Sequence, residues 1–281
     1  MDNKTILSLK KAACNVRMGV IEGTLAAKSG HPGGSLSIAE ILTYLYFKEM
    51  NIDPKDPKKA DRDRFVLSKG HAAPGLYSVL AERGYFDKAD LKTLRKPDSY
   101  LQGHPDMKNI PGVDMSSGSL GQGISAACGM ALSSKHFGSG FRVYTIVGDG
   151  EAEEGQVWEA AMFASHKALD NLVCFVDYNG LQIDGSVEEV NGPAPFEDKF
   201  KAFGWNVVTI NGHDFKQIEK ALNKARKTKG MPTAIIAKTV KGKGVSFMEN
   251  QVNWHGAAPN AEQAETALAE LKAELSKLEG K

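Results

Sequence analysis

Short runs of apolar, β-branched residues recur along the chain and alternate with longer segments in which apolar residues return at helical spacing. The short runs are typical of buried strands, and the longer segments are typical of helices that bury one face. Strands are predicted at residues 64–67, 143–147, 172–176, 205–210 and 233–240, and helices at 5–28, 38–50, 74–83, 87–94, 124–133, 196–203 and 214–228. This alternation favours an α/β fold, a doubly wound, mainly parallel sheet with helices on both faces.

The segments between these elements carry further signals. Ser37 and Glu40 have the spacing of a capping box, which predicts that helix 38–50 begins there. Residues 95–117 and 186–196 show no periodicity and are predicted to be loops. A loop as long as the first of these, inside a compact domain, is usually functional.

The unit at residues 143–180 has the clearest pattern. Its first apolar run stops at Gly148-Asp149-Gly150, a helical pattern follows, and its second apolar run ends at Tyr178-Asn179-Gly180. A strand, a crossover helix and a second strand make adjacent parallel strands, with a right-handed crossover in nearly all proteins. Asp149 and Asn179 are therefore expected at the carboxyl ends of neighbouring strands, the edge at which open α/β sheets bind ligands.

The residue types at this edge suit a metal ion and a diphosphate. The Asp149 carboxylate, the Asn179 amide oxygen and a backbone carbonyl after it, such as that of Leu181, are the hard oxygen ligands that Mg²⁺ prefers. The flanking Gly148 and Gly150 let the backbone approach a bulky anion, and the N-terminus of the crossover helix favours negative charge. The alternative, two ordinary strand-ending turns, explains each segment alone but not the pair.

Composition narrows the range of functions. The 281 residues are 42% hydrophobic and 25% charged, with 35 Lys and Arg against 34 Asp and Glu, so the formal net charge is +1. No basic stripe supports binding of nucleic acid or of an anionic membrane, and no apolar stretch is long enough to span a bilayer. Residues 1–11 lack a secretory apolar core, so we expect a cytoplasmic protein. Cys14, Cys128 and Cys174 lie in apolar patterns, which predicts buried free thiols in a reducing compartment.

Four of the seven histidines lie beside glycine or in loops. A single loop histidine is usually a surface or hydrogen-bonding residue, but four in one α/β domain favour a site that holds hydroxyl groups and moves protons. These candidates are His31, His71, His104 and His255, whereas His136, His166 and His213 fall in helix or turn contexts and are interpreted as structural.

Several short motifs resemble the N-terminal half of transketolase and occur in the same order as in that family. They are G-D-G at 148–150 followed by Asn179, S-G-H-P-G-G at 29–34, S-K-G-H-A at 68–72, G-H-P at 103–105, G-S-L-G-Q-G at 118–123 and W-H-G at 254–256. The resemblance covers nearly the whole chain. It implies a thiamine diphosphate-binding fold, and we identify the chain as resembling the N-terminal, diphosphate-binding subunit of a split, two-chain transketolase.

The resemblance also implies roles for individual residues. Thiamine diphosphate would bind with Mg²⁺, or with Ca²⁺ or Mn²⁺ in its place, and the metal ligands would be Asp149, Asn179 and the carbonyl of Leu181. The expected contacts to the cofactor are Gly148, Gly150, His71, Gly118, Ser119 and Leu120, with Ser119 standing where many relatives carry proline. The catalytic set would be His31, His71, His104 and His255, which match positions that contact the donor sugar or the cofactor.

Three charged residues keep two interpretations each. Glu154 matches an acidic residue near the dimer interface and is counted with the cofactor site, but it equally suits charge compensation at a helix N-terminus. Lys241 and Lys243 follow the last predicted strand, so they would lie near phosphate or be solvated charges at a strand end.

The domain organisation is predicted as one α/β domain at residues 1–259 and an amphipathic helix at 260–281. Leu268, Leu271, Leu275 and Leu278 form the apolar stripe of that helix, which must pack on this domain, on a second copy or on a partner. In the family, the glutamate that activates thiamine and the arginines that hold the substrate phosphate lie on a second, pyrimidine-binding domain. A partner chain with that domain and a C-terminal domain is therefore expected, in an α2β2 heterotetramer.

The expected activity is transfer of a two-carbon ketol unit from a ketose phosphate to an aldose phosphate, in the pentose phosphate pathway. One alternative is another thiamine diphosphate enzyme acting on sugar phosphates or unphosphorylated sugars, similar to 1-deoxyxylulose-5-phosphate synthase. A second is a non-catalytic subunit that keeps the cofactor pocket. A dinucleotide-binding domain is set aside, because the sequence lacks G-x-G-x-x-G after its first strand.

Overall fold

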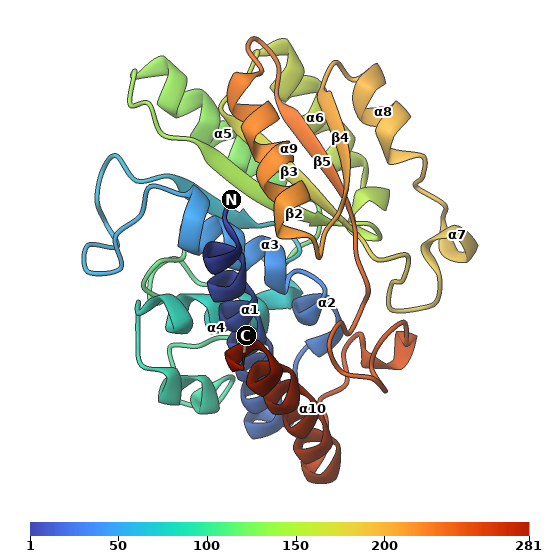
Figure 1. Cartoon of the computed structure of the whole chain (residues 1–281). Helices are drawn as coiled ribbons and strands as arrows, with labels where there is room; N and C mark the ends of the chain where they lie inside the picture. Colours follow the sequence, from blue (N-terminus) through green and yellow to red (C-terminus); the bar gives the residue numbers. More distant parts are fainter. Residues whose placement is uncertain (281) are drawn as a thin grey trace.

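The central feature of the fold is a five-stranded parallel sheet with strand order β1-β2-β3-β5-β4, seen in a computed structural model that describes residues 1–280 (Figure 1). Its strands are β1 (Arg64–Leu67), β2 (Val143–Gly148), β3 (Leu172–Tyr178), β4 (Asn206–Asn211) and β5 (Thr233–Lys238). All four pairings are parallel. The predicted fold class is confirmed, and each predicted strand is present.

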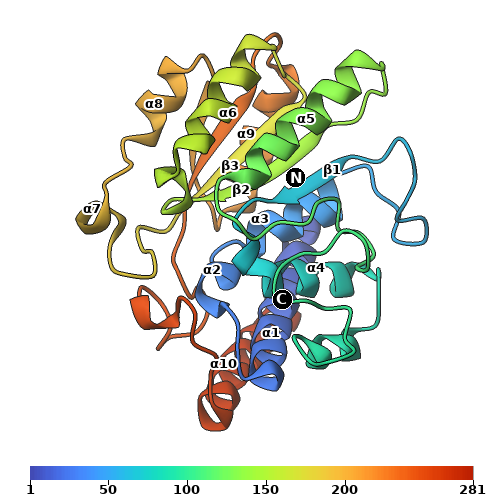
Figure 2. The same ribbon diagram turned by 180° about the vertical axis from the view of Figure 1, so that it is seen from behind.

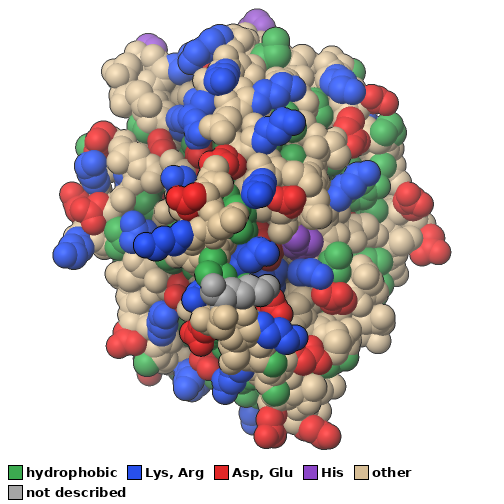
Figure 3. All heavy atoms as spheres, viewed as in Figure 1, with side chains coloured by type: hydrophobic (Ala, Val, Ile, Leu, Met, Phe, Trp, Pro, Cys, Tyr) green, Lys and Arg blue, Asp and Glu red, His purple; other side chains and the backbone are tan. Residues whose placement is uncertain are grey.

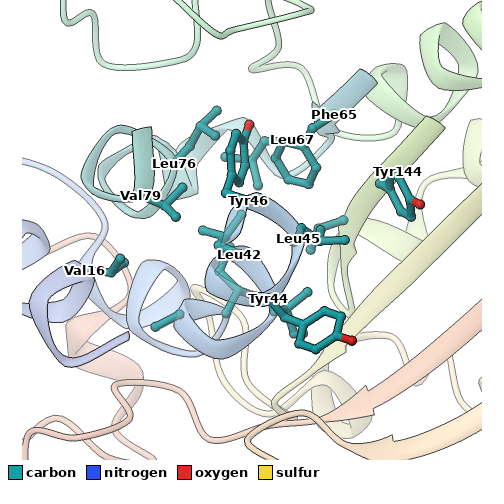
Figure 4. Packing of buried hydrophobic residues seen from close by; sticks show 14 of the residues in the cluster. Val16, Leu42, Tyr44, Leu45, Tyr46, Phe65, Leu67, Leu76, Val79 and Tyr144 are labelled. Atoms are coloured by element: carbon teal, nitrogen blue, oxygen red, sulfur yellow. The ribbon is translucent and has the colours of Figure 1, made fainter. Parts of the chain in front are cut away.

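Helices cover both faces of the sheet (Figures 1 and 2). One face carries α1 (Asn3–Ala27), α3 (Ala39–Tyr44), α4 (Ala73–Arg83) and α9 (Phe215–Lys227), and the other carries α5 (Gln122–His136), α6 (Gly155–His166) and α8 (Phe196–Ala202). On the first face, Leu42, Leu45 and Tyr46 pack against Phe65 and Leu76 (Figure 4). The inner strands β2 and β3 are almost wholly buried because both of their faces are covered.

The predicted helix at 38–50 is wrong in detail. The structure has α2 (Pro32–Leu36), α3, and then one turn of π-helix at Leu45–Glu49. The expected capping box is absent, because the Ser37 hydroxyl bonds to Gly34 and to Asp177 and the Glu40 carboxylate pairs with Arg17. The two side chains that would form a local capping box are instead bonded to residues of other elements, such as Asp177 and Arg17.

Two other segments differ from the prediction in smaller ways. The helix predicted at 87–94 is a 3₁₀ helix, Lys88–Thr93. The loop predicted at 186–196 contains one short helix, α7 (Val187–Val190), whose first turn is capped by the Ser186 hydroxyl. Neither difference changes the sheet or the edge at which the site lies.

The C-terminal helix α10 (Ala261–Glu279) lies against α1 (Figure 1). Leu271 and Leu278 are buried there, and Leu268 and Leu275 are partly buried beside the same apolar cluster. The helix begins at Asn260, whose side chain forms a capping box with Gln263. The apolar stripe of this helix is therefore covered by the chain itself.

The surface is of mixed charge, with Lys and Arg next to Asp and Glu across the face shown in Figure 3. All three cysteines are free and buried, as predicted. Within residues 1–280, no helix combines the length and the apolar character that crossing a membrane would require.

Candidate functional site

The carboxyl ends of β2 and β3 bring Asp149 and Asn179 together. Gly148 is paired with Asp177 in the sheet, so the residues that follow leave the sheet side by side. The Gly180 N–H donates to Asp149 Oδ2 at 2.6 Å and the Gly150 N–H donates to Oδ1 at 2.9 Å. The predicted placement of these two residues is therefore confirmed.

A cavity of about 280 Å³ opens at this edge of the sheet. Its walls come from segments far apart in the sequence: the loop before α2, the ends of β1, β2, β3 and β5, and the segment that precedes α10. The cavity is lined by His31, Gly34, Lys69, His71, Gly118, Leu120, Gly148, Asp149, Gly150, Glu151, Asn179, Leu181, Gln182, Ile183, Lys241 and His255. Ten of these sixteen residues are among the thirteen site residues proposed from the sequence.

Three residues that line the cavity, Asp149, Asn179 and Leu181, carry the kind of oxygen atoms that a hard cation prefers as ligands. Asp149 is only 3% exposed, and burial, reinforced by the charge of Asp177, raises its pKa. A cation beside this carboxylate would favour its ionised form. The carbonyl of Leu181 already accepts a hydrogen bond from a cation, the Lys241 ammonium, at 2.8 Å. A metal ion bound there would take the place of this ammonium at the carbonyl.

The side chain of Asn179 is oriented by two neighbours. Its Nδ2 donates to Asp177 Oδ2 at 3.0 Å, and its Oδ1 accepts from the Leu181 N–H at 3.1 Å. No cluster of three His, Cys, Asp or Glu side chains within residues 1–280 has the geometry of a metal site. The predicted trio contains only one such side chain, and its other two ligands would be neutral oxygens.

A buried ion pair lies next to the side chain of Asn179, one of the three candidate metal ligands. Lys69 Nζ is 2.7 Å from Asp177 Oδ2, and their side chains are 2% and 0% exposed. The same carboxylate accepts hydrogen bonds from the Ser37 and Thr239 hydroxyl groups. Burial opposes ionisation of Asp177, but the charge of Lys69 and these hydrogen bonds outweigh it and lower the pKa.

A second buried carboxylate, Glu151, joins three segments around the cavity. It accepts from the Ser68 hydroxyl at 2.6 Å and from the N–H groups of Gly121 and Gly148, each at 2.9 Å. Burial raises the pKa of Glu151. The N–H of Gly148 is thus already engaged by the protein.

Three of the predicted histidines form one cluster at the cavity wall. The ring centroid of His31 is 5.2 Å from that of His71 and 5.6 Å from that of His255, and the rings of His71 and His255 are 5.1 Å apart. Burial lowers the pKa of His31 to about 4 and that of His255 to about 3, and it also lowers that of His71. The cluster is therefore neutral at pH 7, and the buried Nδ1 of His31 has no hydrogen-bond partner within residues 1–280.

The other predicted site residues lie around this cluster or outside it. His104 packs its ring against Gly118, where an added Cβ would fall 3.3 Å from the imidazole. Leu120 lines the cavity, whereas Ser119 is exposed and outside its lining. Glu154 is also exposed and outside the lining, at the N-cap of α6 and next to Gly121.

The two lysines after β5 have different environments. Lys241 is 2% exposed, lines the cavity and contacts His255 Nδ1 at 2.9 Å, and burial lowers its pKa. Lys243 pairs instead with Glu249, away from the cavity. The interpretation that these lysines lie near the site therefore holds for Lys241. Lys243 is instead a partly exposed charge in an ion pair.

The histidine interpreted as structural, His213, ties together parts of the fold. Its Nδ1 lies 2.9 Å from Glu40 Oε2, and its Nε2 accepts from the N–H of Val240, the residue before Lys241. His136 and His166 lie near the ends of α5 and α6.

Sequence reasoning missed Lys69, Asp177 and Glu151. Lys69 stands two residues before His71 in the S-K-G-H-A motif, Glu151 follows G-D-G directly, and Asp177 is the one charged residue of β3. A charge inside an otherwise apolar strand was the available signal for Asp177, since such a charge needs a buried partner.

Comparison with known proteins identifies the kind of domain. The sequence pattern described as "Transketolase, thiamine diphosphate binding domain" matches residues 8–276. The chain is 50% identical to the 6-deoxy-6-sulfo-D-fructose transketolase subunit SqwG of Clostridium sp. (strain MSTE9), over 87% of this chain and 89% of that protein. It is 41% identical to one of the subunits of the apulose-4-phosphate transketolase of Phocaeicola vulgatus, over 94% of this chain and 93% of that protein.

Other transketolases match this chain over less than half of their own length. Human transketolase is 43% identical over 98% of this chain, which spans 44% of the human protein. The transketolase structure from Leishmania mexicana superposes with a TM-score of 0.87 at 30% identity, covering 97% of this chain and 45% of that one.

The fold, the cavity at the strand ends and these matches define a thiamine diphosphate-binding α/β domain. The chain belongs to the transketolase family, of which it represents the N-terminal, thiamine diphosphate-binding part.

Proposed function

We propose that this chain is the diphosphate-binding subunit of a two-chain transketolase that moves a two-carbon ketol unit from a ketose phosphate to an aldose phosphate. The observation that carries the proposal is the meeting, in one cavity, of the Asp149–Asn179–Leu181 oxygens with three neutral histidines. The oxygens suit a metal-bound diphosphate, and the histidines suit a polyhydroxylated substrate.

The metal ion would be held by the Asp149 carboxylate, the Asn179 amide oxygen and the Leu181 carbonyl, and Mg²⁺, Ca²⁺ and Mn²⁺ all suit such a set. Gly150 lines the cavity next to Asp149, and Lys241 adds a positive charge to its wall. Gly118 and Leu120 form the wall that would support the aminopyrimidine ring, with Ser119 beside them. When bound, thiamine diphosphate supplies an electron sink for cleaving and forming the carbon–carbon bond.

The histidines would hold the hydroxyl and carbonyl oxygens of the sugar. Because their pKa values are lowered by burial, His31 and His255 are neutral at physiological pH, so each ring has one nitrogen that donates and one that accepts. His71 would contact the cofactor, and His104 would contact the donor sugar from its place beside Gly118.

A partner chain with pyrimidine-binding and C-terminal domains would complete the site, and the complex is proposed to be an α2β2 heterotetramer. Support comes from the relatives named as subunits, of which this chain covers 89% and 93%. The exposed Glu154, beside Gly121, is suited to an interface between two copies of the site. We assign the protein to the cytoplasm, where its three buried free thiols would stay reduced.

A second candidate function is a transketolase with a modified sugar as substrate. Two similar subunits are named for 6-deoxy-6-sulfo-D-fructose and apulose 4-phosphate rather than for the pentose phosphate pathway. Both candidates use the same cofactor and the same two-carbon transfer, and they differ only in the sugar.

The test is an assay of the purified chain combined with its partner, supplied with thiamine diphosphate and Mg²⁺. With xylulose 5-phosphate and ribose 5-phosphate, the proposal expects sedoheptulose 7-phosphate. Turnover only with 6-deoxy-6-sulfo-D-fructose or apulose 4-phosphate as donor would support the second candidate. Binding of the cofactor without turnover of any of these sugars would contradict both candidates and favour a non-catalytic subunit.

A further inference from the structure

The loop that follows β5 brings Lys241 into the cavity. The Lys241 ammonium donates to the Leu181 carbonyl at 2.8 Å and lies 2.9 Å from His255 Nδ1, and the residue is only 2% exposed. A lysine side chain is a flexible four-carbon stem, so the groups that its ammonium can reach depend on where its backbone is held. What fixes the backbone beside Lys241 therefore bears on the cavity.

The peptide N–H next to Lys241 is held by the side chain of His213. The Val240 N–H donates to His213 Nε2 at 2.9 Å. His213 belongs to the loop after β4, where its own N–H donates to Asn211 Oδ1 at 2.9 Å. Because β4 and β5 are neighbours in the sheet, this side chain joins the loops at their two carboxyl ends.

The ring of His213 is oriented by Glu40. A backbone N–H can only donate, so Nε2 carries no proton and the ring proton is on Nδ1, which donates to Glu40 Oε2 at 2.9 Å. The same oxygen accepts from Arg17 Nη2 at 2.7 Å. Burial opposes ionisation of Glu40, but the charge of Arg17 and the hydrogen bond from His213 outweigh it and lower the pKa to about 2. A carboxylate at one ring nitrogen fixes the tautomer, so the other nitrogen is presented to Val240.

Arg17 holds the other side of the same loop. Its Nε donates to the Lys243 carbonyl at 2.8 Å. Lys241 therefore lies between two anchored peptide groups, and both anchors meet on Glu40. The three side chains of this network are between 8% and 14% exposed, so water competes little with their hydrogen bonds. None of the three lines the cofactor cavity, so their effect on it must pass through the loop.

We propose that His213 is a positioning residue, which holds the Val240 N–H and so sets where Lys241 presents its ammonium to the cavity. Glu40 acts one step further back, by keeping the ring in the tautomer that accepts at Nε2. The inference rests on the proposed function, since it takes the cavity as the site of a metal-bound diphosphate. An ammonium already held at the cavity wall favours binding of the diphosphate, because the side chain does not have to be ordered when the anion binds.

Two substitutions separate the two hydrogen bonds of the His213 ring. The side-chain oxygen of glutamine reaches about as far as Nε2, so His213→Gln keeps an acceptor for the Val240 N–H. Asparagine reaches only about as far as Nδ1, so His213→Asn keeps a partner for Glu40 and loses Val240. In calorimetry of the two-chain complex with Mg²⁺, His213→Asn is expected to weaken thiamine diphosphate binding by about 10- to 100-fold, the usual effect of losing an outer partner of a metal site. His213→Gln should bind close to the wild type.

A double-mutant cycle tests whether His213 acts through Lys241. In the Lys241→Met background, His213→Asn should weaken binding little further. Equal weakening by His213→Asn with and without Lys241 would overturn the proposal, and so would unchanged affinity in His213→Asn alone. The control is Ile218→Val, which removes a buried methyl group from α9 and destabilises the fold but removes neither hydrogen bond of His213. It should bind as the wild type does.

NMR without the cofactor separates this inference from the proposed function. In the two-chain complex, the ring signals of His255 report its contact with Lys241 Nζ, and slow hydrogen exchange of the Val240 amide reports the bond to His213. His213→Asn should shift the first and speed up the second, and His213→Gln should do neither. No change in either signal in His213→Asn would refute the positioning role even if the complex proves to be a transketolase. Both changes, in a complex that does not bind thiamine diphosphate, would retain the positioning of Lys241 and refute the proposed function.

Discussion

Replacing Lys69 with methionine tests whether the buried ion pair with Asp177 supports the site. The pair has a 2.7 Å separation and exposed fractions of 2% and 0%, so neither charge can be solvated by water. Lys69→Met leaves the Asp177 carboxylate buried with only its hydrogen-bond donors. Removing one partner of a buried pair costs about 3–5 kcal/mol. We therefore expect a loss of about this size in the free energy of unfolding.

The assay is urea unfolding of the chain, followed by circular dichroism. The control is Lys135→Met, which removes the cation of a partly exposed pair with Asp170, where the side chains are 37% and 22% exposed. An exposed pair contributes about 0–1 kcal/mol, so this control should unfold close to the wild type. The double variant Lys69→Met with Asp177→Asn also removes the unpaired carboxylate charge, so it should lose less unfolding free energy than Lys69→Met alone.

The pH dependence follows from the lowered pKa of Asp177. A carboxyl group whose folded-state pKa lies below its unfolded value of about 3.9 contributes stability above that pH, and this contribution is lost as the pH falls through the folded-state pKa. The difference between the wild type and Asp177→Asn should therefore persist from pH 7 to pH 5 and shrink below pH 4. A Lys69→Met variant as stable as the Lys135→Met control would show that the buried pair of Lys69 and Asp177 does not stabilise the fold.

Three further predictions follow from the buried groups around the site. Glu151→Ala leaves the N–H groups of Gly121 and Gly148 without their acceptor, and each should lower the free energy of unfolding in urea by about 1–3 kcal/mol. The control Glu153→Ala removes a carboxylate that is only partly buried and should lower the unfolding free energy far less. Equal losses in the two variants would contradict the hydrogen bonds assigned to Glu151. His31 should have a pKa of about 4 by NMR, below its unfolded value of about 6.5, so as the pH drops from about 6.5 to 4 the unfolded chain takes up the proton first and the free energy of unfolding falls. His31→Gln should reduce the slope of the unfolding free energy against pH by up to about 1.4 kcal/mol per pH unit. An unchanged slope in His31→Gln would contradict a buried, neutral His31 ring. Leu271→Ala, at the contact of α10 with α1, should lower the free energy of unfolding by about 2–5 kcal/mol in the same assay, and Leu268→Ala should lower it less because Leu268 is only partly buried. A larger loss in Leu268→Ala than in Leu271→Ala would show that α10 packs differently.

The parts of the site that lie close in sequence to a strand end were predictable. Asp149 and Asn179 follow apolar runs that a crossover helix joins, and the geometry of parallel strands places such residues at one edge. The same logic placed His71 after β1 and Lys241 after β5. The loop histidines His31 and His255 were singled out by their position beside glycine or in loops, and the resemblance then implied their roles. Periodicity could not place them together, because it does not show where a loop folds back.

The parts that depend on distant pairing were not predictable from periodicity. Asp177 contacts Ser37, Lys69 and Thr239, and Glu151 contacts Ser68 and Gly121, all from other elements. Ser37 has the local spacing of a helix cap, but a buried carboxylate offers its hydroxyl a stronger partner.

Calorimetry of thiamine diphosphate binding to the two-chain complex probes the proposed metal–diphosphate site itself. We expect binding that requires Mg²⁺ in the wild type, and in Asp149→Ala a loss of affinity of more than about 100-fold, or about 2.7 kcal/mol, because the one charged metal ligand is gone. Asp184→Ala, an exposed carboxylate in the loop after Leu181, is the control and should bind as the wild type does. Binding of equal affinity in Asp149→Ala and the wild type, or binding that does not depend on the metal, would contradict the assignment of Asp149, Asn179 and Leu181 as the metal–diphosphate site.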